Sequence, residues 1–162
     1  FSGSRNHTIA RKDEDVERLK EEGFEVLQLD LDRSVSIDRA VERLYALTDG
    51  RLYAVFNNAA YGQPGAVEDL SREALRRQFE TNLFGTHELT VKLLPMMIKA
   101  KEGRIVQNSS VLGFAAMRYR GAYNASKFAL EGLSDTLRLE LEGTGVHVSI
   151  IEPGPIRSRF RA

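Results

Sequence analysis

A tyrosine and a lysine four residues apart are the side chains whose spacing most directly suggests chemistry. Tyr123 and Lys127 stand in a strongly helical run over residues 122–141, and side chains four apart share one helix face, about 5–6 Å apart at Cβ. A nearby ammonium lowers the pKa of a phenol from its usual value of about 10. A phenol tuned toward neutrality can serve as a general acid or base. The alternative is a half-buried aromatic ring beside a solvated lysine.

Strands and helices alternate along the chain that must position this pair. The sequence predicts strands at residues 7–10, 24–29, 52–56, 104–107 and 146–151, and helices at residues 13–22, 34–47, 71–99 and 122–141. Asn82 and Gly85 weaken the middle of the long third helix. Several strands are near-continuous apolar runs, which is typical of a parallel sheet with helices on both faces. We therefore expect a single α/β domain over residues 1–162.

Polar, small or conformationally special residues follow each predicted strand. They are Arg11-Lys12, Asp30-Leu31, Asn57-Asn58-Ala59-Ala60, Asn108-Ser109-Ser110 and Pro153-Gly154. In open α/β sheets, ligands bind outside the carboxyl ends of the strands. Turn residues also belong at such positions, so the evidence lies in the set of five and not in any single one.

The composition excludes several classes of protein. The 23 basic and 23 acidic residues cancel, which gives no reason to expect a nucleic-acid partner or an anionic membrane surface. The absence of Cys excludes disulfides and a thiolate metal site, and we expect no metal. The sequence has no apolar run as long as a membrane span, and its first residues do not read as a signal peptide. We expect a soluble, cytoplasmic protein.

Taken in order, these motifs resemble the short-chain dehydrogenase/reductase family over about residues 8–160. The marks that carry the resemblance are Asp30, Asn57-Asn58-Ala59-Ala60, Asn82, Ser110, Tyr123-x-x-x-Lys127 and Pro153-Gly154. The resemblance implies a Rossmann-type, doubly wound parallel sheet. It also implies an oxidoreductase that moves a hydride between a nicotinamide cofactor and an alcohol, ketone or aldehyde.

The resemblance implies a role for each of four catalytic residues. Tyr123 would exchange a proton with the substrate oxygen, and Lys127 would lower the pKa of Tyr123 and bind the nicotinamide ribose. Ser110, chosen over Ser109 for its spacing to Tyr123, would hold the substrate oxygen. Asn82 would support a water in a proton relay from Lys127. The alternative role for Asn82, which is compatible with the first, is that it interrupts the helix and its side-chain amide hydrogen-bonds to nearby backbone carbonyls.

The resemblance also implies a set of cofactor contacts. Asp30 would meet the adenine amino group, and residues 58–60 would pass under the ribose, with Ala60 where many relatives have Gly. The residues expected to bind cofactor are Arg11, Asp30, Leu31, Asn58, Ala59, Ala60, Tyr123, Lys127, Pro153, Gly154, Ile156 and Ser158. Arg11 stands at the end of the predicted strand at residues 7–10, where members of the family bind the adenosine ribose of the cofactor. An arginine side chain there can donate two hydrogen bonds to the 2′-phosphate of NADP, so NADP is favoured and NAD stays possible. The alternative for Arg11-Lys12 is a solvated basic pair.

Two features of the family are missing from the sequence. No first strand and glycine-rich loop precede residue 7, and a βαβ unit needs roughly 30 residues or more. Without that strand two interior strands would have unpaired edges, so we expect an incomplete domain with segments absent among residues 1–10. The later region that sets substrate identity in the family is also missing. Substrate and reaction direction are therefore left open.

Three further expectations remain. Phe114, Met117 and Tyr119 suggest a partly apolar substrate pocket, with retinoid, steroid or carbonyl substrates as the nearest analogy. The helices at residues 71–99 and 122–141 would form a homodimer or homotetramer, although their leucines at 130, 133 and 137 fit core packing equally well. The competing functions are a catalytically silent cofactor-binding regulator and a truncated, non-functional relative.

Overall fold

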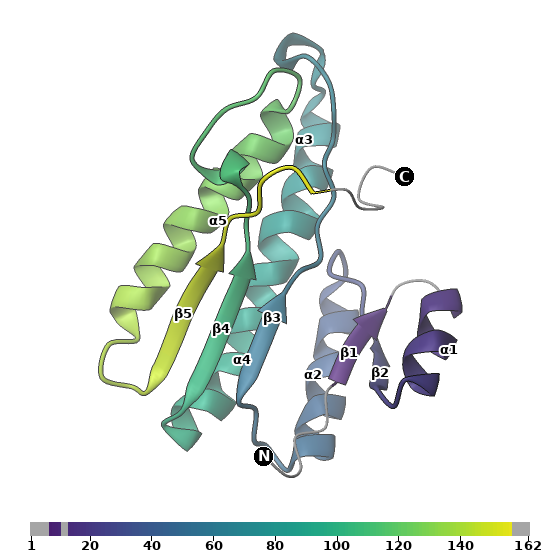
Figure 1. Cartoon of the computed structure of the whole chain (residues 1–162), viewed down its shortest axis with the longest axis vertical. Coiled ribbons are helices and arrows are strands. Elements are labelled where there is room, and N and C mark those ends of the chain that lie inside the picture. Colours follow the sequence, from purple (N-terminus) through teal and green to yellow (C-terminus); the bar gives the residue numbers. More distant parts are fainter. Residues whose placement is uncertain (1–6, 11–12, 157–162) are drawn as a thin grey trace.

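The alternation of strands and helices predicted from the sequence is confirmed. The computed structural model describes residues 7–10 and 13–156, with side chains from residue 17. In chain order the elements are β1 (His7–Ala10), α1 (Asp13–Glu21), β2 (Glu25–Gln28), α2 (Ser34–Thr48), β3 (Ala54–Asn57), η1 (Val67–Asp69), α3 (Arg72–Phe79), η2 (Glu80–Gly85), α4 (Thr86–Ala100), β4 (Gly103–Asn108), η3 (Val111–Gly113), α5 (Gly121–Glu140) and β5 (Val146–Ile151) (Figure 1).

All strand pairs are parallel, but the strands form two sheets. β1 pairs with β2, while β3, β4 and β5 form a separate sheet in that order. Asn57 lies opposite Gln107 and Asn108 lies opposite Ile151, so the three carboxyl ends meet at one edge. Within the described residues β1 does not pair with β3. The predicted unpaired strand edges are therefore present in the structure.

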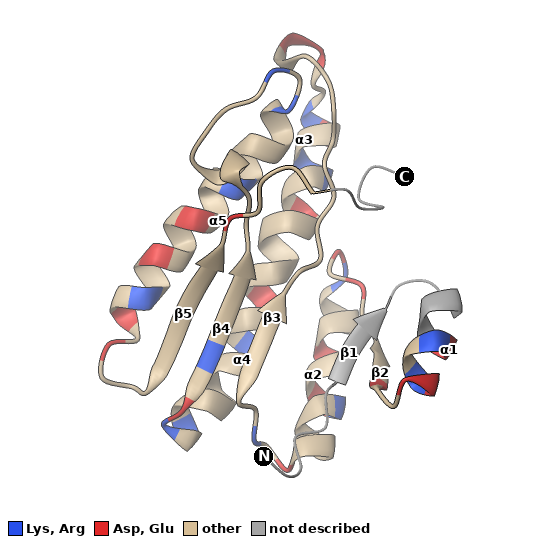
Figure 2. Ribbon diagram, viewed as in Figure 1, with Lys and Arg blue, Asp and Glu red and all other residues tan. Residues whose placement is uncertain are grey.

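Helices pack on the strands of both sheets. Helix α1 contacts β1 and β2, and α2 also contacts β2, while α4 and α5 contact β4 and β5. The face of β3, β4 and β5 that is turned toward the viewer in Figure 1 carries no described helix. In Figure 1, α4 and α5 run behind β4 and β5, and α2 packs against α4. Among the described residues, no helix is long and apolar enough to cross a membrane. Charges of both signs are interspersed along the helices (Figure 2).

Helix α4 joins the two sheets through its buried side chains. Leu93 and Met96 pack into the core beneath β2 and α2, which includes Leu27 and Ile37. Met97 belongs to the core beneath β4 and β5. One helix therefore contributes to both hydrophobic cores, and this packing takes the place of the missing strand pairing.

The long helix predicted over residues 71–99 is interrupted. Two α-helices, α3 and α4, flank the π-helical segment η2, which contains Asn82 and Gly85. Ser71 begins α3 by accepting a hydrogen bond from the amide of Ala74, a standard N-terminal cap. π-Helical turns inside helices are frequent at functional sites. The predicted weak point is where the regular helix breaks.

Candidate active site

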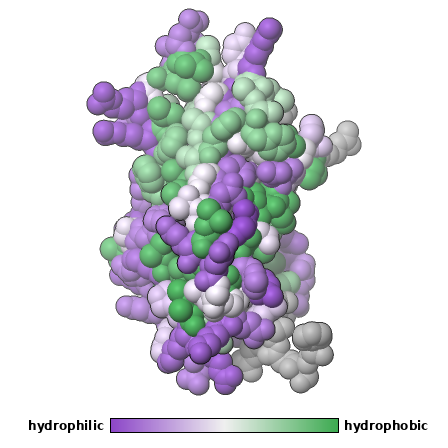
Figure 3. All heavy atoms as spheres, turned by 90° about the vertical axis from the view of Figure 1, so that its left-hand side faces the viewer, coloured by the Kyte–Doolittle hydropathy of each residue, from purple (hydrophilic) through white to green (hydrophobic). Residues whose placement is uncertain are grey.

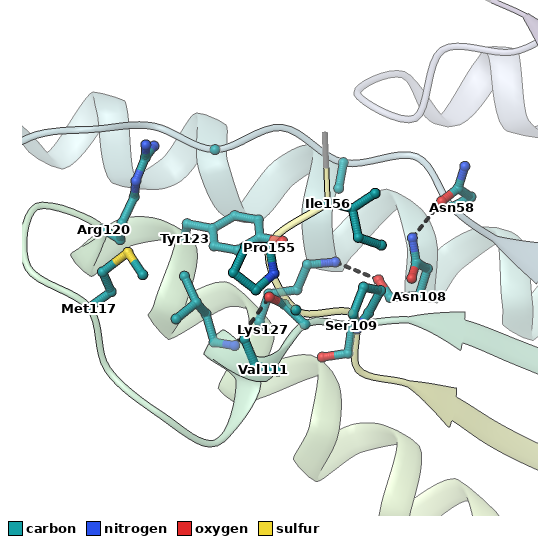
Figure 4. A pocket seen from close by; sticks show the side chains of 16 residues that line it. Asn58, Asn108, Ser109, Val111, Met117, Arg120, Tyr123, Lys127, Pro155 and Ile156 are labelled. Atoms are coloured by element: carbon teal, nitrogen blue, oxygen red, sulfur yellow. Dashed lines mark hydrogen bonds between the residues drawn. The ribbon is translucent and has the colours of Figure 1, made fainter. Parts of the chain in front are cut away.

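Helix α5 brings Tyr123 and Lys127 to the carboxyl edge of the larger sheet. The Lys127 side chain is 2% exposed, and its Nζ donates a 2.7 Å hydrogen bond to the carbonyl oxygen of Asn108 at the end of β4. The same Nζ lies 5.7 Å from the centroid of the Tyr123 ring. The two side chains therefore share one helix face, as the spacing predicted (Figure 4).

Burial dominates the protonation of both groups. It lowers the pKa of Lys127 to about 8, and the charge of Glu131 opposes this effect. Burial also raises the pKa of Tyr123, against smaller lowering effects from a hydrogen bond with Ser110 and the charge of Arg120. The expectation that Lys127 brings the pKa of Tyr123 below its usual value is therefore wrong for this structure. Desolvation of the phenolate outweighs its electrostatic stabilisation.

The two serines after β4 point in different directions. The Ser110 hydroxyl lies beside Tyr123 and also accepts a 3.1 Å hydrogen bond from the amide of Leu112, which begins the turn η3. The Ser109 hydroxyl points away from Tyr123 (Figure 4). Of the two, the structure brings only Ser110 into contact with the tyrosine.

Asn82 ties the loop after β3 to the helix that carries Tyr123. Its Oδ1 accepts a 3.0 Å hydrogen bond from the amide of Tyr61. Its Nδ2 donates to the carbonyl of Tyr61 at 2.9 Å and to the hydroxyl of Ser126 at 3.1 Å, and Ser126 in turn donates to the carbonyl of Tyr123 at 2.8 Å. The alternative role predicted for Asn82, in which its side-chain amide hydrogen-bonds to a nearby backbone carbonyl, is therefore seen in the structure. The predicted relay to Lys127 stays a prediction.

Replacing Asn82 by Ala is expected to lower the free energy of unfolding by about 2 kcal/mol or more. The side chain is 1% exposed, and its loss leaves the Tyr61 amide without its partner, which costs roughly 1–3 kcal/mol when the group is buried. The Tyr61 carbonyl loses one of its two donors and keeps the 2.7 Å hydrogen bond from Gln78. Urea unfolding followed by circular dichroism measures the change. The exposed Glu80 in the same segment is the control, and Glu80→Ala should stay within about 0.5 kcal/mol of the parent. Equal effects of the two substitutions would contradict this reading.

A cleft of about 780 Å³ opens beside these residues. It is lined by Asn58, Ala60, Gly62, Asn108, Ser109, Ser110, Val111, Leu112, Met117, Arg120, Tyr123, Lys127, Pro153, Gly154, Pro155 and Ile156. The ends of β3, β4 and β5 all contribute, so the edge predicted from the strand ends is the edge where the cleft lies. Between two of the lining residues, the Nδ2 of Asn108 donates a 2.5 Å hydrogen bond to the Oδ1 of Asn58.

Several predicted site residues lie outside this cleft. Asp30 closes β2, where its amide donates to the Ser36 hydroxyl, and Leu31 packs against Gly85 of η2. Ala59 is not among the lining residues. Arg11 and Ser158 lie outside the described residues. No group of metal-binding side chains occurs in the part of the chain that the structure describes.

Sequence reasoning missed Arg120, and it placed Asn108 at a strand end without assigning it a contact to Lys127. Arg120 lines the cleft and its charge acts on Tyr123. Its only signal in the sequence is its position three residues before the tyrosine. Asn108 accepts the hydrogen bond from Lys127 with its backbone carbonyl. Every residue has such a carbonyl, so the residue type cannot indicate this contact. The apolar loop residue Met117 does line the cleft, whereas Phe114 and Tyr119 do not.

Comparisons with known proteins point to one family. A model described as short chain dehydrogenase matches residues 2–162. The chain is 51% identical over 156 residues to the "uncharacterized oxidoreductase YbbO" of Escherichia coli K12, covering 95% of this chain and 58% of that protein. It is 37% identical over 135 residues to human retinol dehydrogenase 8, covering 83% of this chain and 42% of that protein.

Solved structures agree with the sequence matches. A short-chain dehydrogenase from Streptomyces avermitilis superposes with a TM-score of 0.91 at 34% identity, covering 98% of this chain and 59% of the other. A metagenomic short-chain oxidoreductase in complex with NADP gives 0.85 at 30% identity, covering 94% and 72%. The chain spans about half the length of the curated relatives it matches.

Proposed function

The chain belongs to the short-chain dehydrogenase family, and from this premise we propose that it transfers a hydride between NADP and an alcohol or carbonyl substrate, with Tyr123 as the acid and base. The observation that carries the proposal is the convergence of Tyr123, Ser110 and Lys127 in one cleft at the carboxyl edge of a parallel sheet. Ligands of such sheets bind at this edge. A protein that only bound the cofactor would have no need of the Tyr–Lys pair.

The cleft suits a nicotinamide cofactor. Lys127 has a buried amino group that donates to Asn108 and retains further N–H donors for a ribose hydroxyl. Asn58, Ala60, Pro153 and Gly154 present small or amide-bearing positions along the same cleft. When bound there, the cofactor supplies the hydride, and the protein supplies orientation and a matched acid.

Protonation of the substrate oxygen falls to Tyr123 and Ser110. Burial keeps the Tyr123 phenol protonated at neutral pH, so it is ready to donate its proton to the oxygen of a carbonyl being reduced. The Ser110 hydroxyl, beside the phenol, can donate a hydrogen bond to the same oxygen. For oxidation of an alcohol the phenol must first lose its proton, so the oxidation rate should rise with pH.

The substrate side of the cleft is mostly apolar. Val111, Leu112 and Met117 line it, and Arg120 adds a charge. Relatives named for apolar substrates include retinol dehydrogenase 8 and 17-beta-hydroxysteroid dehydrogenase type 1. We therefore favour apolar ketones, aldehydes and alcohols.

The protein is also proposed to be a homodimer or homotetramer through α4 and α5. Val91 and Ile98 on α4 and Phe128 and Leu133 on α5 are each more than 40% exposed. Figure 3, viewed from the side of α5 and β5, shows apolar groups set among charged ones. Leu130, by contrast, is buried within the chain, so that residue belongs to the core and not to this surface.

Titration with NADPH and NADH, followed by nicotinamide fluorescence, tests the proposal. NADPH should bind at least about tenfold more tightly than NADH, because Arg11 offers a bidentate fork to the 2′-phosphate. The relative solved with NADP and the relative named as an NADPH-dependent 3-dehydrocapnine reductase support this preference. Arg11→Ala should weaken NADPH and leave NADH unchanged, whereas Lys20→Ala on α1 should change neither.

Three results would contradict the proposal. Equal affinity for both cofactors would remove the assignment of Arg11 and the preference for NADP. If neither cofactor bound at millimolar concentration, the site would be that of an inactive relative. Tight binding without turnover of any carbonyl would favour the cofactor-binding regulator.

A further inference from the structure

Two buried oxygen atoms next to Gly113 have no hydrogen-bond partner among the described residues. They are the hydroxyl oxygen of Ser109 and the Oε1 of Glu131. A Cβ added at Gly113 would lie 2.6 Å from that Oε1 and 2.7 Å from the Ser109 oxygen. Both oxygens therefore border the space that is left because Gly113 has no side chain.

A buried carboxylate oxygen is costly unless something compensates its charge. The compensating group is on the same helix. Lys127 lies one turn before Glu131 on the same face of α5, the spacing at which opposite charges attract. Lys127 and Glu131, both within the described residues, form no direct ion pair, yet the carboxylate charge opposes the effect of burial on the pKa of the lysine.

The other elements packed around Lys127 bring no second carboxylate. β4 contributes the carbonyl of Asn108, and α5 contributes the phenol of Tyr123. Arg120 acts on Tyr123, and Glu152 is exposed after β5. Among the described groups, Glu131 is therefore the acid whose charge acts on the buried amine.

We propose that Glu131 is a positioning residue whose carboxylate, held beside Ser109 in the space left by Gly113, keeps the buried Lys127 charged and so sets the pH range of the site. The inference rests on the proposed function, in which Lys127 holds the cofactor next to Tyr123. Glu131 itself does not line the cleft. It acts on the chemistry only through Lys127.

The direct test is the pKa of the Lys127 amine, followed by NMR of the Cε carbon in protein labelled at lysine. In the parent protein the amine should titrate at about 8. In Glu131→Gln the pKa should fall by roughly half a unit or more, because a charge that favoured the ammonium is gone. Glu140→Gln, an exposed acid on the same helix, should leave it unchanged. An unchanged Lys127 pKa in folded Glu131→Gln protein would overturn the inference.

The pH profile of kcat gives a second reading. Activity that needs the Lys127 ammonium declines as pH rises through its pKa, so the decline should begin at lower pH in Glu131→Gln and return toward the parent in Glu131→Asp. A merely structural role would lower kcat by the same factor at every pH, which would count against the inference. If no substrate is turned over, the proposed function fails, and the NMR titration still decides the role of Glu131.

Ser109→Ala is the matched control for a change in the same space. It removes the neighbouring hydroxyl and leaves both charged groups in place. Because the Ser109 hydroxyl and the Glu131 carboxylate share no hydrogen bond, the charge of Glu131 is kept and the pKa of Lys127 should stay at the parent value. A fall in Ser109→Ala as large as the fall in Glu131→Gln would show that packing, and not the carboxylate charge, sets this pKa, and it would overturn the inference.

Discussion

Replacing Tyr123 by Phe is expected to lower kcat for carbonyl reduction by about a thousandfold or more, within the range of general acid catalysis. The substitution removes one hydroxyl and leaves the aromatic ring packed on α5. Because burial keeps the phenol protonated, it is the group that can deliver a proton at neutral pH. Ser110 stays in place to bind the substrate oxygen, so the loss should fall on kcat and only weakly on KM. Stopped-flow or steady-state loss of NADPH absorbance measures it.

The control separates proton transfer from folding and cofactor binding. Tyr123→Phe should bind NADPH as the parent does, since Lys127 keeps its hydrogen bond to Asn108. Tyr119→Phe, which removes a hydroxyl from an exposed tyrosine in the preceding loop, should keep kcat within about twofold. A Tyr123→Phe protein with more than a tenth of the parent activity would show that another group, or water, supplies the proton.

Residue type and spacing were sufficient to predict the architecture and the edge of the sheet where the cleft lies. Hydrophobic runs ending in Asn57, Asn108 and Glu152 mark the three strands whose carboxyl ends meet. The choice of Ser110 over Ser109 also agrees with the geometry, because only the Ser110 hydroxyl faces Tyr123. The strands and their shared edge follow from local periodicity and from the topology of parallel sheets, whereas the choice of Ser110 came from the family resemblance.

The direction of the Tyr123 pKa could not be read from the sequence. The four-residue spacing correctly predicted that Lys127 lies beside Tyr123. The direction of the change in the Tyr123 pKa depends on how much water the fold removes from the phenol. Burial is a property of the packed helices and loops around α5 and not of the motif. Glu131 could not be predicted for the same reason, because the burial of its carboxylate oxygen depends on the packing of Gly113 and Ser109 around it.

The π-helical segment η2 shows a second limit. Asn82 and Gly85 marked a weak point in a helix, which propensity can predict. The roles of Asn82 and Gly85 depend on contacts with residues outside the helix. Asn82 satisfies both backbone groups of Tyr61, and Gly85 lets η2 approach Leu31. Neither contact can be inferred from residues 71–99 alone.

Replacing Gly85 by Ala should therefore destabilise the protein, although alanine is the better helix former. Gly85 is in a helical conformation, with φ −65° and ψ −38°, where Ala would ordinarily gain about 0.5–1 kcal/mol. An added Cβ would lie 2.1 Å from the carbonyl oxygen of Leu31 and 2.8 Å from its carbonyl carbon. These are backbone atoms that cannot rotate away, and overpacking of this kind costs about 1–3 kcal/mol or more. The net loss should be about 2 kcal/mol.

Gly132→Ala is the matched control for this substitution. Gly132 is in α5, and an added Cβ there meets no atom within 4 Å, so the intrinsic preference of Ala should stabilise the protein by about 0.5–1 kcal/mol. The two variants make the same chemical change in two helical segments and should shift urea unfolding in opposite directions. If both were stabilising, the close approach of η2 to Leu31 would be wrong. Because Leu31 follows the proposed adenine contact Asp30, Gly85→Ala should also weaken NADPH binding, whereas Gly132→Ala should not.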